Sequence, residues 1–162
     1  MTDVFDSRKR SEVMSRIRSR NTSPELFVRR LLFAAGFRYR LCSAGLPGRP
    51  DVVLPKWRVV VFVNGCFWHV HPGCPRAVEP KTNVDFWRRK LQNNVARDAA
   101  NFEKLQALGW RVLVVWECAC RTSLQEELST SMEHFIKFDV EVPFREIGRE
   151  RLEADSSDVP RK

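Results

Sequence analysis

The chain has 162 residues, of which 43% are hydrophobic and 30% are charged, and its formal net charge is +8. Such values are typical of one globular domain with a hydrophobic core, and they exclude a chain that is disordered throughout. No apolar stretch approaches the roughly 18 residues that a transmembrane helix needs. The excess of positive charge favours a polyanionic partner, most simply nucleic acid, although a solvated basic surface would give the same total.

The N-terminus has no basic-then-apolar signal sequence, and the five cysteines cannot all pair within one chain. Both features predict a reducing cytoplasm, where clustered Cys and His bind metal more often than they form disulfides. We therefore expect a cytoplasmic protein.

Residues 1–20 are expected to form a basic arm, because residues 7–20 carry six arginines and lysines around a thin apolar stripe that includes Met14. A single domain of residues 21–142 follows. Residues 143–162 are charged and poor in apolar side chains, which predicts a loose tail. There is no internal repeat.

In chain order, the domain is predicted to contain a helix, three strands, a helix, a strand and a helix. We expect helices over 23–36 (with Ser23 as its N-cap), 83–108 and 123–138, and strands over 37–41, 51–54, 58–63 and 110–116. The inner side of the second helix is marked by Phe86, Leu91, Val95, Phe102, Leu105 and Leu108. This order predicts an α/β fold in which a mixed sheet is flanked by helices.

The segment from Val59 to His71 is the centre of this arrangement. A strand of valines and Phe62 ends in Asn64-Gly65, and Cys66, two aromatic residues and two histidines follow at once. A buried strand is a rigid support, so functional groups just beyond its end are held in place.

Three potential metal ligands lie within nine residues, namely Cys66, His71 and Cys74, and Cys118 follows the last strand of the core. Three cysteines and one histidine form a closed tetrahedral set, which is typical of structural zinc. Cys120 is an alternative fourth ligand, and ordinary reduced cysteines are the alternative for the whole set. Because all four positions of such a site are filled by protein, catalysis needs a second site.

Asp51 and His69 are the reactive groups that remain near the end of this strand. A carboxylate and an imidazole can hold Mg²⁺ and move a proton at neutral pH, as phosphodiester hydrolysis requires.

Five motifs resemble those of the very short patch repair (Vsr) endonucleases. They are Arg-Asn-Thr-Ser-Pro-Glu (20–25), Leu-Pro-Gly-Arg-Pro-Asp (46–51), Gly-Cys-Phe-Trp-His (65–69), Phe-Trp…Lys…Asn-Val…Arg-Asp (86–98) and Gly-Trp-Arg-Val…Trp-Glu-Cys (109–118). The resemblance implies a restriction-endonuclease-like core of the PD-(D/E)xK type, with one structural Zn²⁺ and a catalytic Mg²⁺. It also implies a Mg-dependent endonuclease that nicks beside the T of T:G mismatches left by deamination of 5-methylcytosine.

The resemblance also implies roles for individual residues. Asp51 and the Val63 carbonyl match magnesium ligands, His69 matches the general base, and Glu25 and Asp98 match acids that hold water and the histidine network. Cys66, His71, Cys74 and Cys118 match the zinc ligands, with one extra residue between the second and third. The DNA-contacting positions are matched by Met14, Phe67, Trp68, Trp87, Lys90 and Asn94.

One position departs from the family pattern, which has Thr-His where this chain has Val63-Asn64. Asn64 can donate and accept hydrogen bonds but does not titrate. The sequence thus predicts a monomeric, bacterial, nucleoid-associated mismatch endonuclease acting on double-stranded DNA, with mismatch-repair proteins as further partners. A sequence-specific nickase or restriction-type nuclease on the same core, and a zinc-stabilised DNA-binding module without catalysis, are the alternatives.

Overall fold

The computed structural model describes residues 20–41 and 45–157. Met14, nearly all of the predicted basic arm, and Cys42 lie outside these ranges. The described helices are α2 (Ser23–Ala34), α3 (Val84–Ala107), α4 (Gln125–Lys137) and α5 (Arg149–Ser157), with short 3₁₀ helices at Pro55–Trp57, Glu117–Ala119 and Thr122–Leu124. The strands are β1 (Val52–Leu54), β2 (Val59–Asn64), β3 (Arg111–Trp116) and β4 (Phe144–Ile147).

The four strands form one mixed sheet in the order β1-β2-β3-β4. β1 is antiparallel to β2, with Val52 opposite Val61, whereas β2 and β3 are parallel, with Asn64 opposite Trp116. β4 is also parallel to β3. The expected mixed α/β architecture with flanking helices is confirmed.

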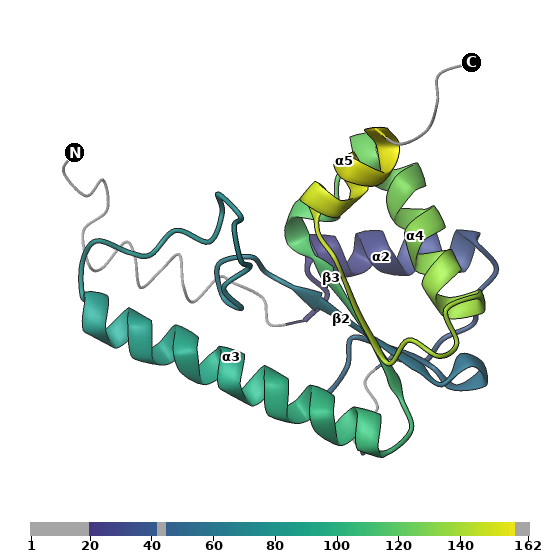
Figure 1. The fold of residues 1–162 in the computed structure, drawn as a ribbon, viewed down its shortest axis with the longest axis horizontal. Coiled ribbons are helices and arrows are strands. Elements are labelled where there is room, and N and C mark those ends of the chain that lie inside the picture. The colour runs from purple at the N-terminus through teal and green to yellow at the C-terminus, as the bar shows by residue number, and fades with distance from the viewer. Residues whose placement is uncertain (1–19, 42–44, 158–162) are drawn as a thin grey trace.

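Alternate side chains of the strands enter two separate cores, because successive residues of a strand point to opposite faces. Val59 and Val61 pack with α2 and α4 on one face, and Val60 and Phe62 pack with α3 on the other. Figure 1 shows α3 alone on its side of the sheet and α2, α4 and α5 grouped on the opposite side.

The first half of α3 extends past the sheet (Figure 1). For this reason the prediction of which α3 residues face the core is partly wrong. Phe86 and Val95 are exposed, while Leu91 and Leu105 are buried as expected. Leu108 is also exposed, because it follows the end of α3. The buried positions of α3 also include Trp87.

Two local predictions near α2 are wrong. The N-cap of α2 is Thr22 rather than Ser23, and the Thr22 Oγ1 accepts a hydrogen bond from the Glu25 N–H at 3.4 Å. The predicted strand over 37–41 is a single bridge between Arg40 and Val53. Its apolar–basic alternation instead reflects burial of Phe37, which packs edge-on against Trp57.

The described part of the predicted C-terminal tail (143–162), residues 143–157, is not the loose tail that its composition predicted. Residues 144–147 form β4 at the edge of the sheet, and residues 149–157 form α5. The segment has few apolar side chains, but Ile147 and Leu152 are 0% and 1% exposed and belong to the core beneath α4. Placement of these two side chains, rather than overall composition, decides that the segment folds.

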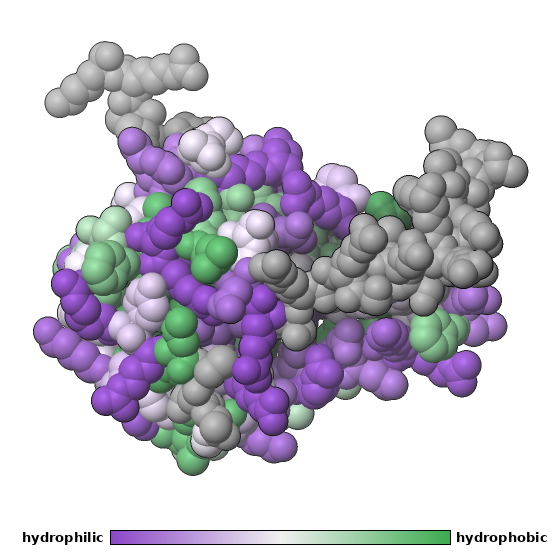
Figure 2. All heavy atoms as spheres, turned by 180° about the vertical axis from the view of Figure 1, so that it is seen from behind, coloured by the Kyte–Doolittle hydropathy of each residue, from purple (hydrophilic) through white to green (hydrophobic). Residues whose placement is uncertain are grey.

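No described helix is both long enough and apolar enough to cross a bilayer. Figure 2 shows the face behind that of Figure 1, on which hydrophilic side chains predominate and hydrophobic ones are dispersed among them.

Replacing Leu152 with Ala tests whether α5 is part of the fold. Because the side chain is fully buried, the variant should lose about 2–5 kcal/mol of unfolding free energy in urea denaturation. The neighbouring Arg151→Ala is the matched control, since Arg151 is exposed. If both variants are equally stable, residues 149–157 do not contribute to the fold, as the loose-tail prediction stated.

Candidate functional site

A pocket of about 1040 Å³ lies where β1 begins and β2 ends, and all four predicted catalytic residues line it. It is lined by Glu25 from α2, Asp51 before β1, Val63 and Asn64 from the end of β2, His69 from the following loop, and Asp98 from α3. These residues are up to 73 positions apart in sequence (25 to 98). They meet at one edge of the sheet, where α2 and α3 contribute Glu25 and Asp98 from its two sides (Figure 1).

Asp51 is anchored across the end of the hairpin. Its N–H donates to the Val61 carbonyl at 3.0 Å, and its Oδ2 accepts from the Val63 N–H at 2.7 Å. The pKa of Asp51 is raised from 3.8 to about 6, mainly because the carboxyl is buried and to a smaller extent because the Glu25 carboxylate is near, and the Val63 N–H, Arg29 and His69 partly oppose this rise. A buried carboxylate with a raised pKa is a group that a bound cation would stabilise.

Glu25 belongs to a buried network that sequence reasoning missed. Its Oε2 accepts from Arg29 Nη2 at 3.0 Å and from the Asn21 N–H at 2.8 Å, and Arg29 Nη1 donates to Asn21 Oδ1 at 2.6 Å. Glu25 and Arg29 are 5% and 8% exposed. The available signal was the spacing of an acid and a base four residues apart on one helix, which is usually a surface pair.

His69 is oriented by Asp98, whose Oδ2 lies in hydrogen-bond contact with Nδ1 of the ring. A carboxylate only accepts, so Nδ1 carries a proton, and in the neutral ring Nε2 keeps its lone pair. The arrangement leaves a nitrogen that can take a proton within the pocket.

Basic and aromatic side chains surround these acids. Arg20, Arg49, Lys90 and Arg97 line the same pocket. They give an acidic centre with a basic rim, which suits a ligand that carries both phosphate and a metal ion.

Three predicted DNA-contacting rings, Phe67, Trp68 and Trp87, form one cluster at the start of α3. Their centroids are 5.1–6.0 Å apart, and the Lys90 Nζ lies 5.5 Å from the Trp68 ring and 5.4 Å from the Trp87 ring. Trp87 is only 9% exposed. Asn94 holds the loop in place, since its Nδ2 donates to the Trp68 carbonyl at 3.1 Å.

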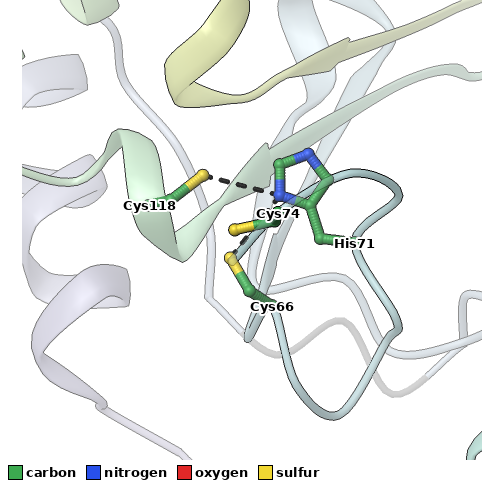
Figure 3. A group of neighbouring side chains, drawn as sticks. All are labelled: Cys66, His71, Cys74 and Cys118. Carbon is green, nitrogen blue, oxygen red and sulfur yellow. Dashed lines mark hydrogen bonds between the residues drawn. The ribbon is translucent and has the colours of Figure 1, made fainter. Parts of the chain in front are cut away.

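The four predicted metal ligands form a second cluster. The ligand atoms of Cys66, His71, Cys74 and Cys118 all lie within 4.8 Å of one another, and all four residues are buried. Figure 3 shows the three sulfur atoms and the His71 ring pointing toward one another, with Cys118 contributed from beyond β3. Nδ1 of His71 is 3.6 Å from Cys66 Sγ and 3.5 Å from Cys118 Sγ.

The donor set fits a thiophilic metal ion. A hydrogen bond from the Cys66 thiol lowers the pKa of Cys118 to about 5, which favours the thiolate that binds metal. The alternative ligand Cys120 lies outside the cluster. Its thiol faces the Trp116 carbonyl at 3.8 Å, and burial raises its pKa to about 12.

Val70 lies between one residue of each site, since His69 faces the pocket and His71 faces the cysteines. Its φ is 52°, in the left-handed region that β-branched residues rarely adopt. The reversal is held on both sides, since the His69 N–H donates to the Gly65 carbonyl at 3.2 Å and the His71 N–H to the Cys66 carbonyl at 2.9 Å.

We expect about one metal ion per chain at the cysteine cluster. Cys118→Ser should lower both the bound metal, measured by multi-element analysis, and the melting temperature, because a closed metal site contributes folding free energy. Cys120→Ser is the matched control two residues away and should keep both. Unchanged metal content in Cys118→Ser would contradict the assignment.

Comparisons with known proteins find sequences similar to this chain. The family model described as DNA mismatch endonuclease Vsr matches residues 2–75. The chain is 43% identical over 139 residues to DNA mismatch endonuclease Vsr of Escherichia coli strain K12, covering 84% of this chain and 88% of that protein. It is 48% identical over 118 residues to Type II nicking enzyme V.NmeAIP of Neisseria meningitidis and to Type II nicking enzyme V.XorIIP of Xanthomonas oryzae pv. oryzae.

The last two alignments each cover 73% of this chain and 84% and 86% of the respective relative. Similarity of this extent to a full-length relative, together with the family match, establishes common descent. The chain belongs to the Vsr family of DNA mismatch endonucleases.

Proposed function

We propose that this protein is a magnesium-dependent DNA mismatch endonuclease that nicks one strand beside the T of T:G mismatches arising from 5-methylcytosine. The observation that carries the proposal is the pocket in which Asp51, Glu25 and the His69–Asp98 pair meet under a basic rim. One chain supplies every group that the proposal needs, so a monomer suffices. The mixed sheet, with an acid at the end of its hairpin, supports a restriction-endonuclease-like core.

Asp51 and the Val63 carbonyl would hold the magnesium ion. The Val61 carbonyl and the Val63 N–H both face Asp51, and N–H and C=O of one strand residue point to the same side. The Val63 carbonyl therefore faces this side beyond the end of β1. Oxygen ligands of this kind suit Mg²⁺, which when bound neutralises phosphate charge and lowers the pKa of water.

The His69–Asp98 pair would accept the proton of the attacking water. Asp98 fixes Nδ1 as the protonated nitrogen, so Nε2 is the base. Glu25, held by Arg29, adds a second carboxylate that can orient water by accepting its hydrogen bond. Asn64 lines the same pocket and is 6% exposed, so it can contribute hydrogen bonds but no proton transfer.

The ring cluster supports a preference for mismatches. Phe67, Trp68 and Trp87 would enter the duplex, and Lys90 and Asn94 beside them would contact the bases. A mispaired step is cheaper to unstack than a paired one, so insertion of rings favours it.

We propose zinc as the ion of the cysteine cluster. Three thiolates and one imidazole fill all four positions of a tetrahedral site, which is the arrangement of structural rather than catalytic zinc. Zinc would tie the loop after β2 to the end of β3.

A sequence-specific nickase is the second candidate, favoured by the relatives that are named nicking enzymes. The two functions are separated by a duplex panel that contains T:G, T:A and C:G pairs in several sequence contexts, with and without Mg²⁺. Nicking confined to T:G duplexes supports mismatch repair. Nicking of fully paired duplexes supports the nickase, and binding without nicking leaves a DNA-binding module.

Asp51→Asn should abolish most nicking, by orders of magnitude, while leaving binding to T:G duplex intact. The same change should stabilise the metal-free protein at pH 8. The pKa of Asp51 in the folded protein is raised from 3.8 to about 6, so ionisation of this carboxyl lowers the free energy of unfolding by up to about 3 kcal/mol. Because a raised acid pKa penalises only the ionised form, this gain should appear between pH 4 and pH 6 and be absent below pH 4.

Urea unfolding across this pH range, with a nicking assay beside it, checks both effects. Asn still accepts the Val63 N–H, so the hydrogen bond is retained. If Asp51→Asn nicks at the parental rate, Asp51 is not a catalytic residue.

Trp68→Ala should weaken binding to T:G duplex by about 1–3 kcal/mol, the usual value of one stacked ring. Fluorescence anisotropy against matched T:A duplex measures the difference. Trp57→Ala is a control, because Trp57 packs against Phe37 away from the pocket. If both duplexes are weakened equally, Trp68 serves the fold rather than the mismatch.

A further inference from the structure

We propose that the start of α5 forms the outer layer of the cysteine–histidine metal centre, with Gly148 and Glu150 as positioning residues for His71. The inference rests on the metal centre proposed above. It assigns a role to the C-terminal segment, whose composition alone predicted a loose tail.

The first observation is a backbone contact to a ligand atom. The Arg149 N–H at the start of α5 donates to Cys118 Sγ at 3.4 Å. An N–H donated to sulfur stabilises a thiolate. The polypeptide that follows β4 is therefore in direct contact with a ligand of the site.

The second observation concerns the far side of the His71 ring. Nδ1 faces the sulfur atoms, so Nε2 points away from them. The Glu150 carboxylate lies 3.9 Å from Nε2, and the ring stacks on Trp116 at 4.2 Å with an angle of 8° between the planes. Metal-bound histidines generally direct their other nitrogen at a carboxylate or carbonyl, which fixes the tautomer and the ring orientation.

The third observation is that Gly148 leaves room for this arrangement. A Cβ at position 148 would lie 2.8 Å from Cε1 and 2.9 Å from Nε2 of His71, and 2.9 Å from Glu150 Oε2. Contacts below 3.0 Å cannot be accommodated without movement. A ring that is held by metal on one side and by Trp116 on its face has little freedom to move.

Glu150 lies in the first turn of α5, where a carboxylate complements the helix dipole, and it also faces His71. Its side chain is 54% exposed, at the edge of a hollow of about 510 Å³ that His71 also lines. Among the described residues, His71 is its only ion-pair partner. The segment itself is fixed independently, by the pairing of β4 with β3 and by burial of Leu152. The carboxylate is therefore held in front of His71 by the fold.

The test compares Glu150→Gln with Glu153→Gln in the full chain. Glu153 lies on the same helix but pairs with Arg149 and does not contact His71. Zn²⁺ affinity is measured by competition with a chromophoric chelator, and the site is also loaded with Co²⁺ to record its absorption spectrum. Glu150→Gln should lower Zn²⁺ affinity by about 10- to 100-fold, as loss of such a partner does.

Gly148→Ala should lower the affinity at least as much and should also shift the Co²⁺ spectrum, because the ring must move. Urea unfolding of the metal-free proteins should place Glu150→Gln level with the parent, which separates positioning of the ligand from a general role in folding. Glu153→Gln should match the parent in every measurement.

Equal Zn²⁺ affinity of Glu150→Gln, Glu153→Gln and the parent would overturn the inference, whether or not Gly148→Ala folds. If the parent binds zinc but fails to nick T:G duplex, the proposed function falls while this inference stands. If the parent binds neither Zn²⁺ nor Co²⁺, the metal centre and its outer layer fall together.

Discussion

The parallel pairing of β2 with β3 is the constraint on which both sites depend. Asn64 lies opposite Trp116, so the two strands end at the same edge of the sheet and their following loops begin side by side. The loop after β2 supplies His69 to the pocket and three side chains to the cysteine–histidine cluster, and the turn after β3 supplies Cys118. A shift of one residue between these strands would turn their side chains to the wrong core and separate Cys118 from the other ligands.

One short loop serves both sites, which explains its unusual backbone. Val70 adopts a conformation that costs roughly 1–2 kcal/mol for an ordinary residue, so that His69 and His71 can face opposite ways. Such strain persists where the surroundings over-determine the chain. Here the surroundings are the backbone bonds to Gly65 and Cys66 and the four-ligand cluster. Under the proposed function, metal bound at this cluster would therefore support the His69 imidazole without taking part in its chemistry.

Strands β1 to β3, the long helix and the cysteine–histidine cluster could be predicted from sequence, because valine runs, helical periodicity and the Cys/His spacing are local signals. The positions of Asp51 and His69 followed from the hairpin that joins β1 and β2. Arg29 could not be found this way, because a pair spaced like Glu25 and Arg29 looks the same on a surface helix as in a buried pocket. The fold of 144–157 depends on where two apolar side chains meet the core, which composition does not report.

The edge-to-face packing of Phe67, Trp68 and Trp87 has an energetic consequence for discrimination. Each such contact is worth about 0.5–1.5 kcal/mol, and it must be given up before a ring can enter DNA. Under the proposed function, stacking of the rings on DNA bases must therefore offset the free energy of the ring–ring contacts that are lost. A mispaired step costs less to open than a regular step, so the net free energy of ring insertion is more favourable at a mispair. The cluster that shields these apolar faces in the free protein therefore also increases the preference for mispaired DNA.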